Sequence, residues 1–394
     1  MMPSYAGIRA SFLRPAGRSG NPAWQILEEQ DMRRPGEQDR PRRRPNRLRR
    51  QQRVVGTGHT VPVQVTPVTA VWGLGPCPPP SPPPKTSGSV LLSYTTRFGD
   101  PDPSASEFEH LPDLARKFGQ QLPPPVRRVH LGVGTNRLHA IQWGVGDPEL
   151  LYLHGAGLHA HAWDAVQLHL RRPGLALDLP GHGRSPWRED ADYTPRTMAH
   201  AISSALDVTS NLVVVGHSLG GLTAIALSAL RRELAKALVI IDTAPERDPQ
   251  RLRNNPARAL LAGPGSYTDY EELLEHAIRS GMGKDRETLL PGLQRNTRQR
   301  PDGRIEFKHH LASISPERRL QFDPRDLWPD LESLEMPVLL VYGDTGTLAE
   351  KDIHRLSSRV RRFSSLRLPA GHNVHRDQPA ALARAIAAFT DNPD

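Results

Sequence analysis

The stretch Asn211–Leu230 reads NLVVVGHSLGGLTAIALSAL, and it decides the fold. Its apolar, β-branched start, Leu212–Val215, is typical of a buried strand, and the apolar pattern at its end predicts a helix. Gly216 and Gly220, on the two sides of Ser218, favour a turn so tight that a Cβ at either position would collide with neighbouring backbone. Such a turn holds the serine in a strained conformation and presents its hydroxyl at the sheet edge. The stretch therefore predicts a strand, a sharp turn and a helix, with the serine between them.

The pattern G-x-S-x-G between a strand and a helix resembles the nucleophile elbow of the α/β-hydrolase family. Two other stretches carry the same resemblance, in the family's order. HGAG at 154–157 follows an apolar strand, and DLPGHGRS at 178–185 matches the family's D-x-P-G-x-G-x-S run, whose Asp178 and Ser185 we expect to hydrogen-bond within their own loop. The resemblance covers residues 126–394. It implies an α/β fold in which a mostly parallel sheet has helices on both faces and an inserted helical cap.

Organisation along the chain follows from composition and periodicity. Two parts, 126–245 and 336–394, alternate strands with helices, which indicates a mostly parallel sheet. Residues 246–335, Arg-rich with short helical patterns and little β signal, are expected to be the helical cap. A linker at 89–125, with a short helix at 107–118, precedes the core. The expected core strands are 126–131 and 137–143 (an antiparallel pair), 150–153, 175–177, 212–215, 237–241, 337–342 and 366–368, and the expected core helices are 194–207, 222–234 and 379–389.

The net charge of +9 belongs to the leading segment. Residues 1–90 hold 14 Lys and Arg against 5 Asp and Glu, whereas the rest of the chain holds 37 of each. The body of the chain therefore offers no overall field for a polyanion, and no specific nucleic-acid partner is expected. Residues 1–88, rich in Arg and Pro and poor in aliphatics, are expected to be a disordered tail. A basic binding arm, a targeting segment and an over-early start codon are the alternatives for this tail.

The compartment follows from what the sequence lacks. A single cysteine, Cys77, excludes an intrachain disulfide. The sequence contains no run of about eighteen apolar residues, which a membrane span would need. The N-terminus also lacks the apolar core of a secretory signal. We therefore expect a cytoplasmic protein, and its oligomeric state stays open.

Neither a metal nor a cofactor is expected from the motifs. His154, His159 and His161 are close in sequence, as are His309 and His310, but neither set has the i, i+4 spacing of a zinc helix. No P-loop occurs, and the glycines near 132–134 do not form a dinucleotide fingerprint.

A nucleophilic serine needs a base, and imidazole suits this role because its pKa lies near neutrality. His372 follows the last expected strand, where the family places its base. His375 is the nearest alternative. His217 flanks Ser218, but adjacent side chains at a sharp turn diverge.

The acid of the triad has two candidates. The resemblance places it three or four residues after the glycine that ends strand 337–342, but Gly346 and Thr347 occupy those positions. Asp344 comes directly after that glycine. Asp242 ends the preceding strand, from which some relatives supply the acid. We lean to Asp242, and a chain in which neither residue serves would be impaired in catalysis.

The resemblance implies a serine hydrolase that cleaves a small-molecule carboxylic ester through an acyl-enzyme. Ser218 would attack the carbonyl, His372 would transfer the proton, and the backbone NH groups of Ala156 and Leu219 would bind the oxyanion. A serine at the elbow argues against the dehalogenase and epoxide hydrolase relatives, which use aspartate there.

Two further readings stay open. A lactonase, a carbon-carbon bond hydrolase or a perhydrolase would share the fold. From a different class, a non-catalytic member would bind a small apolar ligand beneath the cap, and the missing acid after strand 337–342 supports it. Substrate identity depends on cap side chains such as Trp328 and Phe322.

Overall fold

The computed structural model describes residues 107–392, except 121, 133, 135–136, 207–210, 283 and 316–320. The expected tail at 1–88 and the first part of the expected linker lie outside the described residues.

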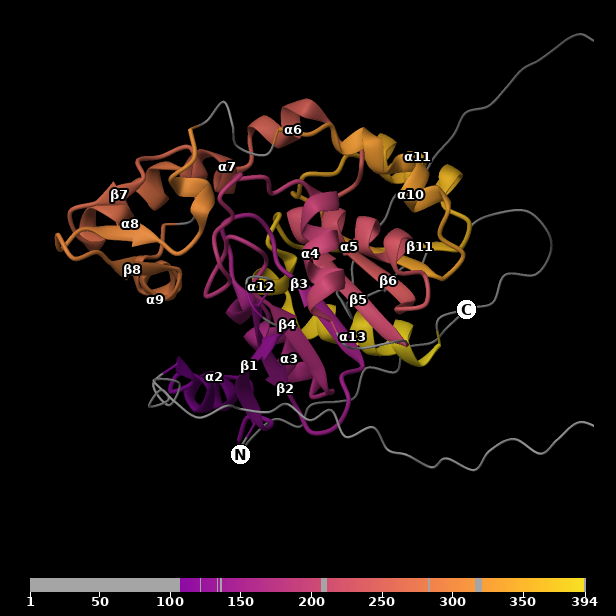
Figure 1. Cartoon of the computed structure of the whole chain (residues 1–394), viewed down its shortest axis with the longest axis horizontal. Coiled ribbons are helices and arrows are strands. Elements are labelled where there is room, and N and C mark those ends of the chain that lie inside the picture. The colour runs from indigo at the N-terminus through magenta and orange to yellow at the C-terminus, as the bar shows by residue number, and fades with distance from the viewer. Residues whose placement is uncertain are drawn as a thin grey trace, which may run out of the picture. The chain divides into compact units, whose positions relative to one another are not determined.

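Eight strands form one sheet in the order β1-β2-β4-β3-β5-β6-β10-β11 (Figure 1). β2 pairs antiparallel with both β1 and β4, and all other neighbours in this sheet are parallel. The expected mostly parallel sheet with an antiparallel start is confirmed. The strands are β1 Val126–Leu131, β2 Leu138–Trp143, β3 Leu150–Leu153, β4 Gly174–Leu177, β5 Leu212–His217, β6 Ala235–Ile241, β10 Val338–Gly343 and β11 Phe363–Leu368.

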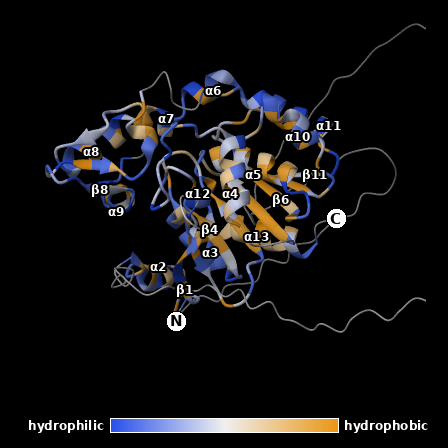
Figure 2. Ribbon diagram, viewed as in Figure 1, coloured by the Kyte–Doolittle hydropathy of each residue, from blue (hydrophilic) through white to orange (hydrophobic). Residues whose placement is uncertain are grey.

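The central strands are apolar along their whole length because helices cover both faces of the sheet. Every residue of β5 is buried. On one face, Trp163, Leu168 and Ile386 pack against Val215 and Val239 in a single apolar cluster. Figure 2 shows the apolar residues gathered on these strands and on the helices beside them. The core helices are α3 Asp164–Leu170, α4 Pro195–Ala205, α5 Leu219–Leu230, α11 Glu350–Arg359, α12 Val374–Asp377 and α13 Pro379–Asp391, with a 3₁₀ turn η2 at Ala160–Trp163.

Helix α5 is the central helix of the core. All of its residues from Leu219 to Ser228 are buried, so its apolar sequence has no polar face. It starts three residues before the expected 222–234 helix, because the chain turns into the helix directly after Ser218. No helix in the described part of the chain combines the length and the apolar character needed to cross a membrane.

The segment between β6 and β10 differs from the expected all-helical insertion. It holds helices and also a three-stranded antiparallel sheet in the order β7-β9-β8. These strands have two or three residues each, which is too short for an alternating pattern to show in the sequence. The elements are α6 Pro249–Arg253, α7 Pro256–Leu261, β7 Ser266–Tyr267, α8 Tyr270–Arg279, α9 Arg286–Arg295, β8 Thr297–Gln299, β9 Ile305–Phe307, η3 His310–Ala312, η5 Pro324–Leu327 and α10 Trp328–Glu332.

This insertion has an apolar cluster of its own, which includes Tyr267, Leu273 and Phe307. It is tied to core loops by polar contacts. The backbone NH of His310 donates to the carbonyl of Gly181 at 2.7 Å, and the Asn296 amide donates to the carbonyl of Gly157.

The helix expected at 107–118 is shorter than predicted. A turn occupies its first residues, and α2 spans Leu111–Lys117. Leu111 and Ala115 are fully buried and belong to the main apolar cluster. The helix is therefore part of the folded core rather than of a free linker.

Candidate active site

Ser218 lies between β5 and α5 in a strained backbone conformation. Its φ is 52° and its ψ is −117°, a region that residues with a side chain rarely occupy. A Cβ at Gly216 would lie 2.4 Å from the carbonyl oxygen of Gly220, and one at Gly220 would lie 2.2 Å from that of Leu153. The strand, the tight turn and the helix are thus as predicted, and both glycines are required sterically.

The structure brings His372 between Ser218 and Asp242. Its Nδ1 lies 2.7 Å from Asp242 Oδ2, and its Nε2 lies 3.0 Å from Ser218 Oγ. A carboxylate only accepts, so Nδ1–H donates to Asp242 and leaves the Nε2 lone pair free to accept the serine proton. His372 follows β11, whose sheet neighbour β10 separates it from β6 and Asp242.

Asp242 is completely buried, and its carboxylate is held by the loop that follows β10. Oδ1 accepts from the NH of Gly343 at 3.1 Å, and Oδ2 accepts from the NH of Thr347 at 2.8 Å and its hydroxyl at 3.0 Å. A Cβ at Gly346 would lie 2.1 Å from Asp242 Oδ1. The carboxylate therefore takes the space that an acid on this loop would need.

Asp344 lies elsewhere on the same loop. Its Oδ1 accepts from the NH of Ala370 at 3.1 Å, and no hydrogen bond joins it to His372 among the described residues. Of the two candidate acids, the structure places Asp242 and not Asp344 against His372.

Two backbone NH groups expected to bind an oxyanion flank the serine. Leu219 is the first residue of α5, where NH groups have no intrahelical acceptor. Ala156 follows β3 in the loop that passes beside Ser218, since a Cβ at Gly155 would lie 3.3 Å from the serine Cβ.

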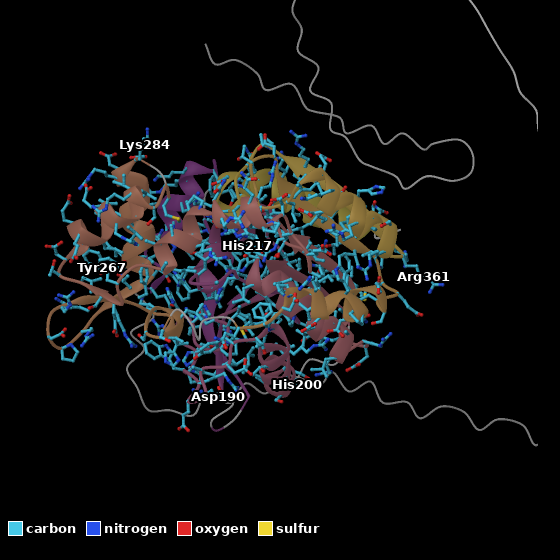
Figure 3. The ribbon with its side chains drawn as sticks, turned by 90° about the horizontal axis from the view of Figure 1, so that it is seen from above. Asp190, His200, His217, Tyr267, Lys284 and Arg361 are labelled. Atoms are coloured by element: carbon cyan, nitrogen blue, oxygen red, sulfur yellow. The ribbon has the colours of Figure 1, made fainter. Side chains whose placement is uncertain are left out.

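The other histidines near Ser218 take different positions. His217 Nε2–H donates to the carbonyl of His372 at 2.9 Å, and its side chain, labelled in Figure 3, is buried. The ring of His375 lies 4.6 Å from that of His217, and burial, followed by nearby Arg376, lowers the pKa of His375 to about 3. His375 thus stays neutral, and it is His372 that contacts the serine.

His154 has a supporting role that the sequence did not indicate. Its Nδ1–H donates to the carbonyl of Gly155 at 2.8 Å, and its Nε2 accepts from the NH of Leu179 at 3.0 Å. Burial lowers its pKa to about 4, so the ring stays neutral and can make both bonds. It joins the HGAG loop to the Asp178–Ser185 loop, and only the pairing of β3 with β4 could have suggested this.

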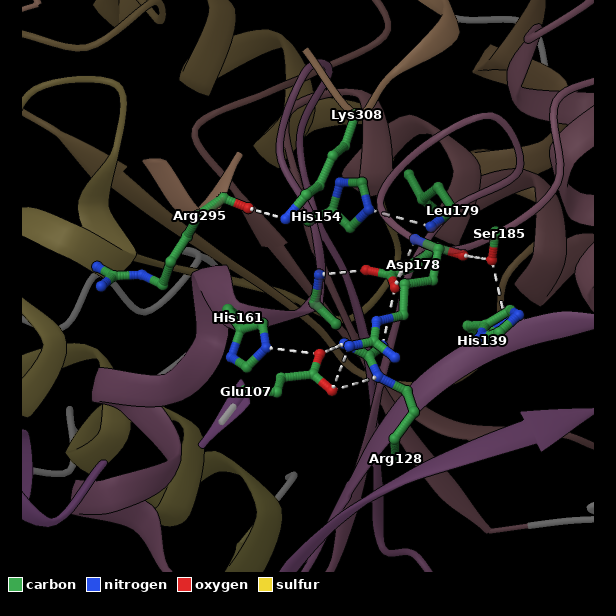
Figure 4. A network of polar contacts seen from close by, with 12 residues as sticks. Glu107, Arg128, His139, His154, His161, Asp178, Leu179, Ser185, Arg295 and Lys308 are labelled. Carbon is green, nitrogen blue, oxygen red and sulfur yellow. Dashed lines mark hydrogen bonds and ion pairs between the residues drawn. The ribbon is translucent and has the colours of Figure 1, made fainter. Parts of the chain in front are cut away.

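The Asp178–Ser185 loop closes on itself as predicted. The Ser185 hydroxyl donates to the carbonyl of Asp178 at 2.6 Å, and the NH of Arg184 donates to Asp178 Oδ2 at 3.1 Å. Asp178 also accepts from Arg128 at 2.8 Å, which Figure 4 shows as part of a larger polar network.

A cavity of about 500 Å³ opens beside His372. Residues from α6 and α7, such as Arg251 and Pro256, line it together with the loop after β10. Neither Trp328 nor Phe322 lines this cavity. Trp328 is buried instead, with the Arg359 guanidinium 3.9 Å above its ring. Its helix α10 lies against α5.

Known proteins resemble a large part of this chain. A model described as the alpha/beta hydrolase family matches residues 150–385. Esterase Rv0045c of Mycobacterium tuberculosis is 32% identical, over 72% of this chain and 96% of that protein. Lipase LipV of the same organism is 30% identical, over 63% of this chain and 96% of that protein.

A solved structure of Rv0045c, from work on its transition metal inhibition, has a TM-score of 0.62 at 32% identity, and the match covers 73% of this chain and 99% of that one. The match to the family model runs from β3 past β11 and includes the Ser218 turn. The chain is thus a hydrolase, and it belongs to the alpha/beta hydrolase family.

Proposed function

We propose that this hydrolase cleaves small-molecule carboxylic esters through a triad of Ser218, His372 and Asp242. The observation that supports this most is the continuous hydrogen-bond chain from the serine hydroxyl through the imidazole to the buried carboxylate. Similarity to an esterase and a lipase supports an ester as the substrate. A third relative, the pimeloyl-[acyl-carrier protein] methyl ester esterase of Aeromonas salmonicida, also has an ester in its name.

In the first half-reaction, His372 Nε2 takes the proton of Ser218 as the hydroxyl oxygen attacks the ester carbonyl. Asp242 keeps the other ring nitrogen protonated and stabilises the imidazolium that forms. The NH groups of Ala156 and Leu219 would donate to the oxyanion of the tetrahedral intermediate. Collapse of this intermediate expels the alcohol, which takes the proton from His372, and leaves an acyl group on Ser218.

In the second half-reaction, a water molecule gives its proton to His372 and attacks the acyl carbonyl. The resulting intermediate collapses to the carboxylic acid, and the proton returns from His372 to the serine oxygen. The strained turn at Ser218 supports both halves, because it fixes the hydroxyl before substrate binds.

Residues 246–335 would act as the cap over this site, with residues 126–245 and 336–394 as the catalytic core. The cavity beside His372 supports this division, because residues of α6 and α7 meet core loops around it. Its volume of about 500 Å³ is in the range of small-molecule sites, and of the three proposed triad residues only His372 lines it.

The non-catalytic reading loses its main support in this structure. It rested on the absent acid after β10, and Asp242 lies where such an acid would reach His372. Lactone, carbon-carbon bond and perhydrolase chemistry would use the same triad and differ in the substrate.

Hydrolysis of p-nitrophenyl esters from acetate to octanoate, with lactones in parallel, tests the proposal. We expect ester turnover by the wild type, loss of turnover in Ser218→Ala, and covalent labelling of Ser218 by a fluorophosphonate. Ser204→Ala, which changes an exposed serine on α4, should behave as the wild type. An inert wild type whose Ser218 also resists the fluorophosphonate would return the chain to the ligand-binding class.

A further inference from the structure

Three side chains of metal-ligating type meet away from the triad. His110 precedes α2, His161 lies in η2, and Asp164 begins α3. Both histidines point at the same carboxylate oxygen: His110 Nε2 is 2.7 Å and His161 Nδ1 is 2.8 Å from Asp164 Oδ2. The three ligand atoms all lie within 4.8 Å of one another, the only such group found in the described part of the chain.

We propose that His110, His161 and Asp164 form a binding site for a divalent transition metal ion such as Zn²⁺. Two imidazoles and one carboxylate favour zinc, copper, nickel or cobalt over magnesium and calcium, which prefer oxygen ligands. In the metal-free protein each of the two nitrogens carries a proton toward Asp164, and a bound metal ion takes the place of these protons.

The spacing suits a tetrahedral ion. With bonds of about 2.0–2.1 Å, neighbouring ligand atoms of such a site lie about 3.3 Å apart. The two nitrogens are 2.7 and 2.8 Å from the oxygen, so each contact has to open by roughly half an ångström. The contact of His110 can open by small torsions of its side chain, because about a quarter of its surface is exposed, whereas the contact of His161 needs a small shift of the Asp164 carboxylate.

A second carboxylate orients the His161 ring. Its Nε2 lies 3.0 Å from Glu107 Oε1, which leaves Nδ1 as the ligand atom (Figure 4). Metal-binding histidines commonly donate their other NH to a carboxylate in this way. Glu107 is in turn held by Arg128 and Arg184, so this support is rigid.

One polar atom of the group is buried and unsatisfied in the described part of the chain. Asp164 Oδ1 is buried and has no hydrogen-bond partner among the described residues. A metal ion that spans both oxygens of Asp164 would satisfy it. Glu107, His110 and His161 also line a cavity of about 490 Å³, which gives an ion a route to the site and room for water as a further ligand.

Metal binding here would join the segment before the matched family region to the core. His110 comes from the turn before α2, whereas His161 and Asp164 come from the elements that follow the HGAG loop. The ion would therefore cross-link two segments that are more than 50 residues apart, and this should raise the melting temperature.

Calorimetric titration of Zn²⁺ into the metal-free, untagged full chain tests the site. We expect one tight equivalent and a higher melting temperature, and cobalt in place of zinc should give the visible absorption of a tetrahedral site. Removing a ligand with His110→Ala should weaken binding by about 100-fold or more, since the loss of an outer-shell partner alone costs about 10–100-fold. His110 makes no capping bond to α2, so this variant leaves the helix start intact.

Two further variants and two controls keep the outcome decisive. Asp164→Asn should also lose binding, and Glu107→Gln should weaken it by about 10–100-fold. His200→Ala, an exposed histidine at the edge of the molecule in Figure 3, and Ser218→Ala should bind as the wild type. A wild type that takes up no equivalent of Zn²⁺, or a His110→Ala variant that binds it unchanged, would overturn the proposal. Because the readout is binding, neither result depends on the esterase activity.

Discussion

His372 and His161 both have their two ring nitrogens engaged, but with different partners. His372 lies between the hydroxyl of Ser218 and the carboxylate of Asp242. His161 lies between two carboxylates, Asp164 and Glu107. Although burial opposes it, the charge of Asp164 and the hydrogen bonds that the ring donates to both acids raise the pKa of His161 to about 9.

The different partners of these two rings explain why one histidine can act as a base and the other cannot. Two carboxylates keep the imidazole charged at neutral pH, so it has no lone pair for a substrate proton. A single carboxylate fixes the tautomer, and the hydroxyl on the other side leaves that lone pair available. The same side chain thus belongs to an ionic network and to the proposed metal site at position 161, and it is proposed to be the catalytic base at position 372.

Removing the hydroxyl beside His372 should have the largest effect. We expect Ser218→Ala to lower kcat/KM for p-nitrophenyl butyrate by about 10⁴- to 10⁶-fold, because the covalent route is lost. The measurement is initial rates with the exposed Ser204→Ala variant beside it. Activity within tenfold of the wild type would place the nucleophile elsewhere.

Removing one carboxylate beside His161 should cost stability rather than activity. Glu107→Gln leaves the buried Arg128 with one acid fewer, which we expect to cost about 3 kcal/mol in the free energy of unfolding. Urea unfolding measures this, with the exposed neighbour Glu109→Gln as the matched control. Equal unfolding midpoints for the two variants would mean that the ion pair of Glu107 with Arg128 does not stabilise the fold.

A change at His217, which contacts only the backbone of His372, should have a smaller effect on activity. His217→Phe removes the hydrogen bond to the His372 carbonyl, which we expect to lower kcat by about tenfold with KM nearly unchanged. His217→Gln, which can still donate, should recover part of that loss. A change in KM alone would instead indicate a role in substrate binding.

His375 is the opposite case, because it is buried and no carboxylate of the described residues contributes to its pKa. Its pKa falls to about 3, from about 6.5 in the unfolded chain. Protonation therefore favours unfolding, so its contribution is present above pH 6.5 and is lost as the pH falls toward 3. His375→Asn should reduce the pH slope of the unfolding free energy in this window by about 1.4 kcal/mol per unit. An unchanged slope would show that His375 is not held neutral.

Local patterns predicted much of the fold. The β-branched runs gave the strands at the sheet centre, and Gly216 and Gly220 gave the turn at Ser218, because those features depend on neighbours along the chain. The short strands β7, β8 and β9 were missed, since two or three residues carry no period.

The acid could not be chosen from the sequence. Asp242 and Asp344 follow adjacent parallel strands, so both reach the same edge of the sheet. Which of the two acids reaches His372 depends on the backbone of Asp242, whose φ is positive, and on the Asp242 carboxylate filling the space that a side chain at position 346 would need. Both are properties of the folded loops. The contacts of His161 with Glu107 and of His110 with Asp164 each cross 54 residues, a separation at which no local pattern applies.

The rate at which a fluorophosphonate labels Ser218 tests the central claim most directly, because it reports how well His372 activates the serine. We predict that Asp242→Asn slows labelling by about 10³- to 10⁴-fold, since the wrong imidazole tautomer then faces the hydroxyl. Asp344→Asn should label within a few-fold of the wild-type rate. Fast labelling of Asp242→Asn together with slow labelling of Asp344→Asn would contradict the assignment and make Asp344 the acid.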